Sequence, residues 1–142
     1  METEGVFAPE TAAAAREAYD SVGGPAREVV RETAKAMGFD GDEYRDRVTG
    51  AVVETARDAL FASLLEVHHG TRGAFDDWCD DHPDLDRQVA GSEDVANVAW
   101  HAAPASGVVV AATYQDEPDA AASAVRRQAF GRVYRPLFEA DG

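Results

Sequence analysis

The chain has few or none of several features that are common in proteins, and each absence excludes a class of protein. Among 142 residues there is one lysine, Lys35, and one cysteine, Cys79. A lone cysteine cannot form an internal disulfide, so nothing indicates an oxidising compartment. Apolar runs are far shorter than the ~20 residues that span a bilayer. Glu2 and Glu4 replace the basic start of an export signal. Together these shortages predict a soluble cytoplasmic protein without membrane contact.

Acidic residues dominate what is present. Asp and Glu number 27 against 13 Lys and Arg, for a formal net charge of −14. Such an excess, spread over the whole chain, suits a medium in which mobile ions screen surface charge, because the Debye length falls to about 3 Å at 1 M salt. Arginine in place of lysine fits too, since the guanidinium is weakly hydrated and pairs bidentately with carboxylates. We expect salt adaptation, with an ordinary acidic protein of a low-salt cytoplasm as the alternative.

The first half of the chain has helical periodicity. An alanine-rich segment at 11–22 stops at two glycines, and a segment opened by proline at 25–38 has an apolar stripe. A third segment at 42–63 has a break or bend near Gly50. We therefore predict three helices within 1–63. The stripe of the second helix consists of Val29, Val30, Thr33, Ala34 and Met37.

From residue 64 onward, short runs rich in valine and aromatic residues predict strands. The expected elements are a strand at 64–70, a helix from Thr71 to Pro83, a brief edge strand at 87–90, strands at 97–102 and 108–114, and a last helix from Pro118 to about Tyr134. The segment 64–70 could instead be the frayed end of the third helix. Residues 104–107 suit a hairpin loop, so we expect the two flanking strands to pair antiparallel.

These elements predict an α+β fold. Three N-terminal helices precede a β-α-β-β-β-α unit whose small, mostly antiparallel sheet packs against the C-terminal helix. The length suits a single domain over 1–142, with a helical part at 1–63 and an α+β part at 64–142. The expected core anchors are Trp100 and Phe130, surrounded by Val110, Val133, Leu60 and Val98.

Three histidines are the candidate catalytic residues. His68 and His69 are adjacent in a predicted strand, so their side chains point to opposite faces and at most one of them can join His101. One of the pair, His101 and a carboxylate such as Glu66 or Asp76 could supply three zinc ligands, but the spacing matches no established motif. We therefore expect structural histidines and neither a bound metal nor a cofactor.

Cys79 is a weak candidate for a nucleophile. Four aspartates surround it in sequence, and negative charge raises the pKa of a thiol, whereas a reactive cysteine needs a lowered one. We expect Cys79 to pack beside Trp78 and Phe75. The aspartates lack the alternating carboxylates and central glycine of a calcium loop, so a solvated helix face is the better interpretation.

Four arginines near the C-terminus form a basic island. On a helical wheel Arg126 falls within the apolar arc, so it needs an acidic partner, which we expect to be Glu54 or Glu66. Arg127, Arg132 and Arg135 lie outside the arc. They are candidates for binding phosphate or an acidic partner, although surface arginines more often pair with nearby carboxylates.

Nucleic acid is an unfavourable partner. Residues 34–49 imitate a helix-turn-helix, but the second helix carries Asp42, Glu43 and Asp46 against two arginines, which repels phosphate. A protein partner or a second copy of the chain fits better.

Three segments carry a family resemblance. They are residues 31–53 (RETAKAMGFDGDEYRDRVTGAVV), 100–104 (WHAAP) and 126–138 (RRQAFGRVYRPLF). The chain resembles an uncharacterised family of small acidic proteins from halophilic archaea, a domain of unknown function. The resemblance implies habitat and compartment, and it brings no activity and no functional residue.

Two functions of different class remain. The first is a non-enzymatic protein-binding or regulatory module that uses the sheet face or the arginine-bearing helix, and we favour it because no catalytic groups converge in the sequence. The alternative is a small hydrolase or metal-dependent enzyme centred on His101 with His68 or His69. A deep pocket at His101 would favour chemistry.

Overall fold

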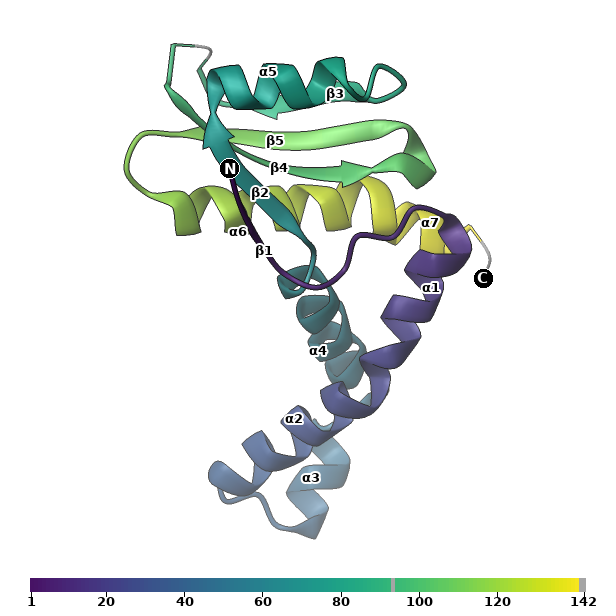
Figure 1. Cartoon of the computed structure of the whole chain (residues 1–142). Coiled ribbons are helices and arrows are strands. Elements are labelled where there is room, and N and C mark those ends of the chain that lie inside the picture. Colours follow the sequence, from purple (N-terminus) through teal and green to yellow (C-terminus); the bar gives the residue numbers. More distant parts are fainter. Residues whose placement is uncertain (93, 141–142) are drawn as a thin grey trace. The chain divides into compact units, whose positions relative to one another are not determined.

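The computed structural model describes residues 1–92 and 94–140, and its chain divides into two compact units (Figure 1). The sheet unit contains Met1–Ala15 and Ala62–Gly142, and the helical unit contains Arg16–Phe61. The first fifteen residues therefore join the C-terminal half of the chain. Sequence reasoning instead placed them in a helical part at 1–63.

The sheet unit is built on a five-stranded mixed sheet with strand order β1-β2-β4-β5-β3. The strands are β1 (Glu2–Glu4), β2 (Val67–Thr71), β3 (Asp86–Ala90), β4 (Asn97–Ala103) and β5 (Val108–Tyr114). Neighbouring strands run antiparallel except β3, which is parallel to β5. Together with the helices, this sheet confirms the α+β class.

The hairpin of β4 and β5 forms the centre of the sheet. Its antiparallel pairing is confirmed, with Trp100 opposite Ala111 and His101 opposite Val110. A short 3₁₀ turn at Pro104–Ser106 connects the strands and ends at Gly107, whose φ of +68° lies in the left-handed region that glycine adopts with little strain. Because side chains alternate along a strand, Trp100 and His101 point to opposite faces.

Helices cover both faces of this sheet. Helix α5 (Arg72–Asp80) lies on one face and α6 (Pro118–Ala129) on the other (Figure 1). Thr71 caps α5, since its hydroxyl accepts a hydrogen bond from the Ala74 N–H at 3.1 Å. The core on the α5 side consists of Phe75, Cys79, Val98, Trp100, Val109 and Ala111, with Trp78 and Leu85 packed against it.

The expected core anchors are buried, but they do not form one cluster. Trp100 belongs to the layer beneath α5, whereas Phe130 continues the helical segment on the opposite side of the sheet. A sheet covered on both faces has two apolar layers, and sequence reasoning had merged them. Leu60 is only half-buried, and its neighbour Phe61 is fully buried instead.

The C-terminal helix continues beyond its predicted end near Tyr134. After α6 the chain makes a π-helical turn at Phe130–Tyr134 and then forms α7 (Arg135–Glu139). Pro136, just after the predicted end, falls in the first turn of α7, where a missing N–H is tolerated. An added Cβ at Gly131 would meet nothing within 4 Å, so this glycine marks the π-turn rather than a close contact.

The first half of the chain contains four helices, not the predicted three, and the short strand β1 precedes them. The helices are α1 (Ala12–Ser21), α2 (Gly23–Ala36), α3 (Gly41–Arg47) and α4 (Gly50–Ser63). The break or bend expected near Gly50 is a break between α3 and α4. Asp40 caps α3 by accepting a hydrogen bond from the Glu43 N–H at 2.8 Å.

A cluster around Tyr19 joins α1 to α4 within the helical unit. The Tyr19 hydroxyl donates to Asp58 at 2.6 Å, and the Arg57 guanidinium lies 3.9 Å from the centre of the Tyr19 ring. Arg57 also pairs with Asp20 at 2.7 Å, and the Tyr19 ring meets Phe61 edge-on. Burial and the hydrogen bond to Asp58 raise the pKa of Tyr19 to about 12, so its hydroxyl stays protonated and donates.

Candidate functional site

His101 lies in a closed polar pair beneath the C-terminal helical segment. Its side chain is 1% exposed, and Tyr134 is fully buried. His101 Nδ1 lies 2.7 Å from the Glu66 carbonyl oxygen, which can only accept, so Nδ1 carries the proton and donates. The Tyr134 hydroxyl lies 2.6 Å from Nε2 and therefore donates to it. Both ring nitrogens are thus occupied.

Burial sets the charge state of this pair. Burial is the main reason that the pKa of His101 is lowered to about 4; electrostatic repulsion from His68 and Arg126 acts in the same direction, and the hydrogen bond to the Glu66 carbonyl opposes it. Burial also raises the pKa of the Tyr134 hydroxyl. At neutral pH both side chains are therefore uncharged. A buried neutral imidazole with both nitrogens bonded serves structure and has no free position for a substrate or metal.

The two neighbouring histidines lie on opposite faces of β2. His68 faces Trp100, with 5.6 Å between ring centres, and its Nε2 lies 3.2 Å from a Glu66 carboxylate oxygen. His69 faces the other side, where its ring meets Tyr114 edge-on and its Nε2 lies 3.4 Å from Glu4. Burial lowers the pKa of His68, which keeps it largely neutral. The three histidines therefore do not share one site.

Metal-binding and thiol chemistry find no suitable geometry in the described part of the chain. Within residues 1–92 and 94–140, no three His, Cys, Asp or Glu side chains are grouped so that they could hold a metal ion. Cys79 packs in the core beneath α5, where burial raises the pKa of its thiol. It is therefore a poor nucleophile.

Arg126 links the helical segment to the N-terminal strand. Its Nη1 lies 3.2 Å from Glu4, and its Nε donates to the Leu65 carbonyl oxygen at 3.0 Å. The same Glu4 carboxylate also contacts His69. Sequence reasoning named Glu54 or Glu66 as the acidic partner, and missed Glu4 because a three-residue acidic strand gives no signal of where it pairs.

The remaining C-terminal arginines are exposed. Arg127 lies on α6, Arg132 in the π-turn and Arg135 on α7, where its guanidinium lies 5.0 Å from the Phe130 ring centre. Among the described residues none of the three forms an ion pair. By contrast Arg87, on β3, pairs with Asp76 at 2.8 Å. None of the three lines a pocket described in the structure.

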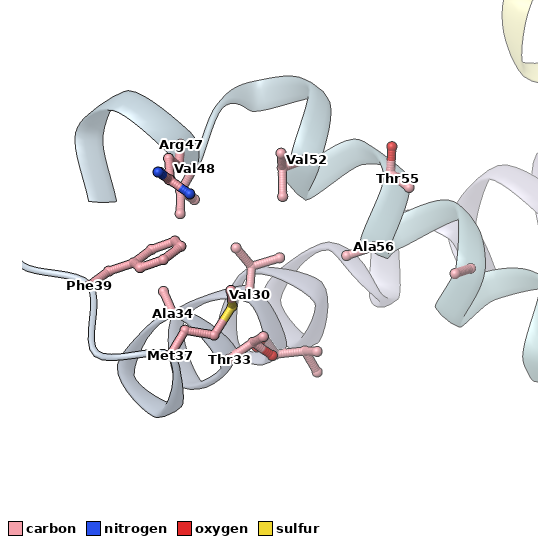
Figure 2. A pocket seen from close by; sticks show the side chains of 12 residues that line it. Val30, Thr33, Ala34, Met37, Phe39, Arg47, Val48, Val52, Thr55 and Ala56 are labelled. Atoms are coloured by element: carbon pink, nitrogen blue, oxygen red, sulfur yellow. The ribbon is translucent and has the colours of Figure 1, made fainter. Parts of the chain in front are cut away.

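The helical unit contains an open apolar groove with a volume of about 420 Å³ (Figure 2). One wall comes from α2 and the segment after it, and the other from the end of α3 and from α4. Figure 2 shows Val30 and Met37 facing Val52 and Ala56 across the groove. The lining residues are Val29, Val30, Thr33, Ala34, Met37, Phe39, Arg47, Val48, Val52, Thr55, Ala56 and Ala59.

The chemistry of this groove is almost wholly apolar. Thr33 donates its hydroxyl hydrogen to the Val29 carbonyl oxygen at 2.7 Å, and Thr55 does the same to Ala51 at 2.9 Å. The lining threonines therefore have no free donor. Arg47 is the one charged lining residue, and its guanidinium lies 5.5 Å from the centre of the Phe39 ring at one end of the groove.

Large apolar side chains remain exposed along this groove. Met37 is 64% exposed, Val29 49% and Val52 42%. The apolar stripe of α2 was predicted from the sequence, but only Val30 and Ala34 on it are buried. The stripe was the sequence signal for the groove, and sequence reasoning did not predict that part of it stays exposed.

No helix among the described residues is both long and apolar enough to cross a bilayer.

A model of a family of unknown function, DUF5809, matches residues 6–135. The chain belongs to this family. The match includes the groove, the three histidines and strands β2 to β5, and the family description assigns no activity to any of them. No curated protein and no solved structure matches the chain.

Proposed function

We propose that this DUF5809 protein is a non-enzymatic protein-binding module whose helical groove accepts a helix of a protein partner. The observation that carries the proposal is the contrast between the apolar groove lining and the highly charged chain. In the whole chain 28% of residues are charged, but the twelve lining residues include only Arg47. Exposed apolar surface gathered in one place on a highly charged protein is typical of an interaction site.

The dimensions favour a helix as the bound element. Two facing helical walls leave an open trough, and helix-in-groove recognition uses apolar anchors spaced i, i+3 or i+4 and i+7. Val30 and Thr33 on α2 and Met37 at its C-cap follow that same spacing. The two surfaces named from the sequence are less suitable, because α5 and α6 cover the sheet faces (Figure 1) and none of Arg127, Arg132 and Arg135 lines a described pocket.

The geometry gives the alternative enzyme little support. His101 is 1% exposed and hydrogen-bonded at both nitrogens, and it lines none of the described pockets. Catalysis needs a reacting group that a substrate can reach.

The amino-acid composition supports a high-salt environment for the module. A charge of −14 and a single lysine suit the cytoplasm of a cell with high internal salt. Hydrophobic contacts are strengthened by excluded salts whereas surface ion pairs are screened. At high salt an apolar groove therefore binds a partner more strongly than a surface that relies on ion pairs.

Affinity capture in molar KCl tests the proposal with three baits. They are the wild-type chain, Met37→Glu in the groove and Val89→Glu, a matched control at an apolar position on β3 that is 38% exposed. We expect the wild-type and Val89→Glu baits to capture the same protein, which can be an untagged copy of the chain. The Met37→Glu bait should recover at least tenfold less of that protein. Equal recovery by all three baits contradicts the proposal.

A further inference from the structure

We infer that the occupant of the groove is the corresponding groove of a second copy, so that two chains pair through α2 and α4 about a two-fold axis. The inference rests on the proposed function and names its partner. Four features of the helical unit carry it: its small core, its charge, the shape of its groove and the extent of the lining.

The helical unit buries too little of itself to be complete. Of the 46 residues in Arg16–Phe61, five are buried, and two of these are alanines. The five are Val22, Ala26, Val30, Ala34 and Phe61. A core this small supplies little stability of its own, so units of this size usually gain stability from disulfides, a metal or contact with further protein surface. The single cysteine, Cys79, lies in the other unit, so a disulfide within the helical unit is excluded.

Charge favours self-association at this place above others. The helical unit carries ten acidic and seven basic residues, a net charge of −3, which leaves −11 of the total −14 on the sheet unit. Two copies of a strongly anionic chain repel each other least through their least charged part. The apolar groove lies in that part.

The shape of the groove is self-complementary. A two-fold interface brings the same surface together from both copies, so that surface must supply both projections and recesses. Val29, Met37 and Val52 are exposed large side chains of the lining, whereas Ala56 and Ala59 contribute only methyl groups on α4. Projecting side chains of one copy can therefore fill the recesses of the other, as knobs fill holes in helical bundles.

The extent of the lining sets the expected affinity. Twelve lining residues a side is below the roughly 20–30 residues a side of a standard stable interface. We therefore expect a dimer with a dissociation constant in the micromolar range, so that the fraction of dimer rises with protein concentration.

Sedimentation equilibrium of the full chain from 5 µM to 1 mM in molar KCl tests this pairing. Four proteins are compared: wild type, Met37→Glu, Val52→Glu and the control Val89→Glu. We expect the wild type and the control to approach twice the monomer mass, and both groove variants to dimerise at least 100-fold more weakly. Far-ultraviolet circular dichroism verifies that the variants keep their helices, which is expected because both positions are exposed.

Each result decides the matter. A wild type that stays monomeric to 1 mM overturns the inference, and so does a dimer that neither groove substitution weakens. A monomeric wild type whose groove still determines capture of a different protein overturns only the second copy and leaves the protein-binding function standing. Loss of dimerisation in both groove variants, with the control unchanged, supports the pairing.

Discussion

The buried His101 makes the stability of the protein depend on pH in a calculable way. Its pKa is about 4 in the folded chain and about 6.5 when the chain is unfolded. The fold therefore favours the neutral ring, and the unfolded chain binds the proton more readily between these two values. The stability that His101 contributes is complete above pH 6.5 and is lost as the pH falls toward 4.

The magnitude follows from the size of the shift. Each pKa unit corresponds to about 1.4 kcal/mol, so the depressed pKa of His101 is equivalent to roughly 3 kcal/mol of unfolding free energy. His101→Leu removes the titration. It also removes the hydrogen bonds that His101 makes with Tyr134 and the Glu66 carbonyl, which costs stability at every pH. The pH-dependent part of the difference between the two proteins therefore belongs to His101 and its proton.

Urea unfolding at fixed KCl measures this difference from pH 4 to pH 7.5. Trp78 and Trp100 both lie in the sheet unit, so their fluorescence reports the unfolding of the region around His101. We expect the advantage of the wild type over His101→Leu to be about 3 kcal/mol larger at pH 7 than at pH 4. A difference that stays within about 1 kcal/mol across this range refutes a neutral, buried His101.

Four further predictions follow from single observations. The thermal midpoint rises between 0.1 M and 2 M KCl, because salt screens the repulsion of a chain of charge −14; a flat or falling midpoint in calorimetry contradicts salt adaptation. Arg126→Met loses about 2–4 kcal/mol in urea unfolding, because the Leu65 carbonyl and Glu4 lose their donor; a loss below about 0.5 kcal/mol counts against the link. Thr71→Ala loses about 1 kcal/mol with its helix cap, whereas Thr71→Ser retains most of it. Cys79 reacts with a thiol reagent at least 100-fold more slowly in the folded chain than in urea, and equal rates refute its burial.

Elements that local patterns determine were predicted well. The hairpin of β4 and β5 was visible as two valine-rich runs around a turn, and the strand period of two placed His68 and His69 on opposite faces. Helix α5 was visible from its cap at Thr71 and its alternating aspartates and aromatics. In each case the decisive contacts lie within a few residues or across one turn.

Elements that depend on distant partners were missed. Strand β1 consists of three exposed residues and exists because β2 offers an edge more than sixty residues away. The parallel pairing of β3 likewise depends on which side of β5 is free. The π-turn at Phe130–Tyr134 places Tyr134 on His101, a requirement of tertiary packing that helical periodicity cannot express.

The groove was missed for a related reason. The apolar stripe of α2 was predicted residue by residue, but the sequence does not say how much of it another helix covers. That coverage depends on how α4 crosses α2, which is decided by packing of whole helices. Here Val30 and Ala34 are buried, whereas Val29 and Met37, on the same stripe, remain exposed.

The two methionines offer the most direct test that the groove is a binding surface. Met37 lies in the groove and is 64% exposed, and Met1 is 71% exposed outside it, so each molecule carries its own control. With ¹³C-labelled methionine methyl groups, NMR spectra recorded from 10 µM to 1 mM follow both sites at once. We predict that the Met37 methyl signal shifts and broadens as the concentration rises while that of Met1 stays constant. A Met37 signal as invariant as that of Met1 would contradict the paired groove.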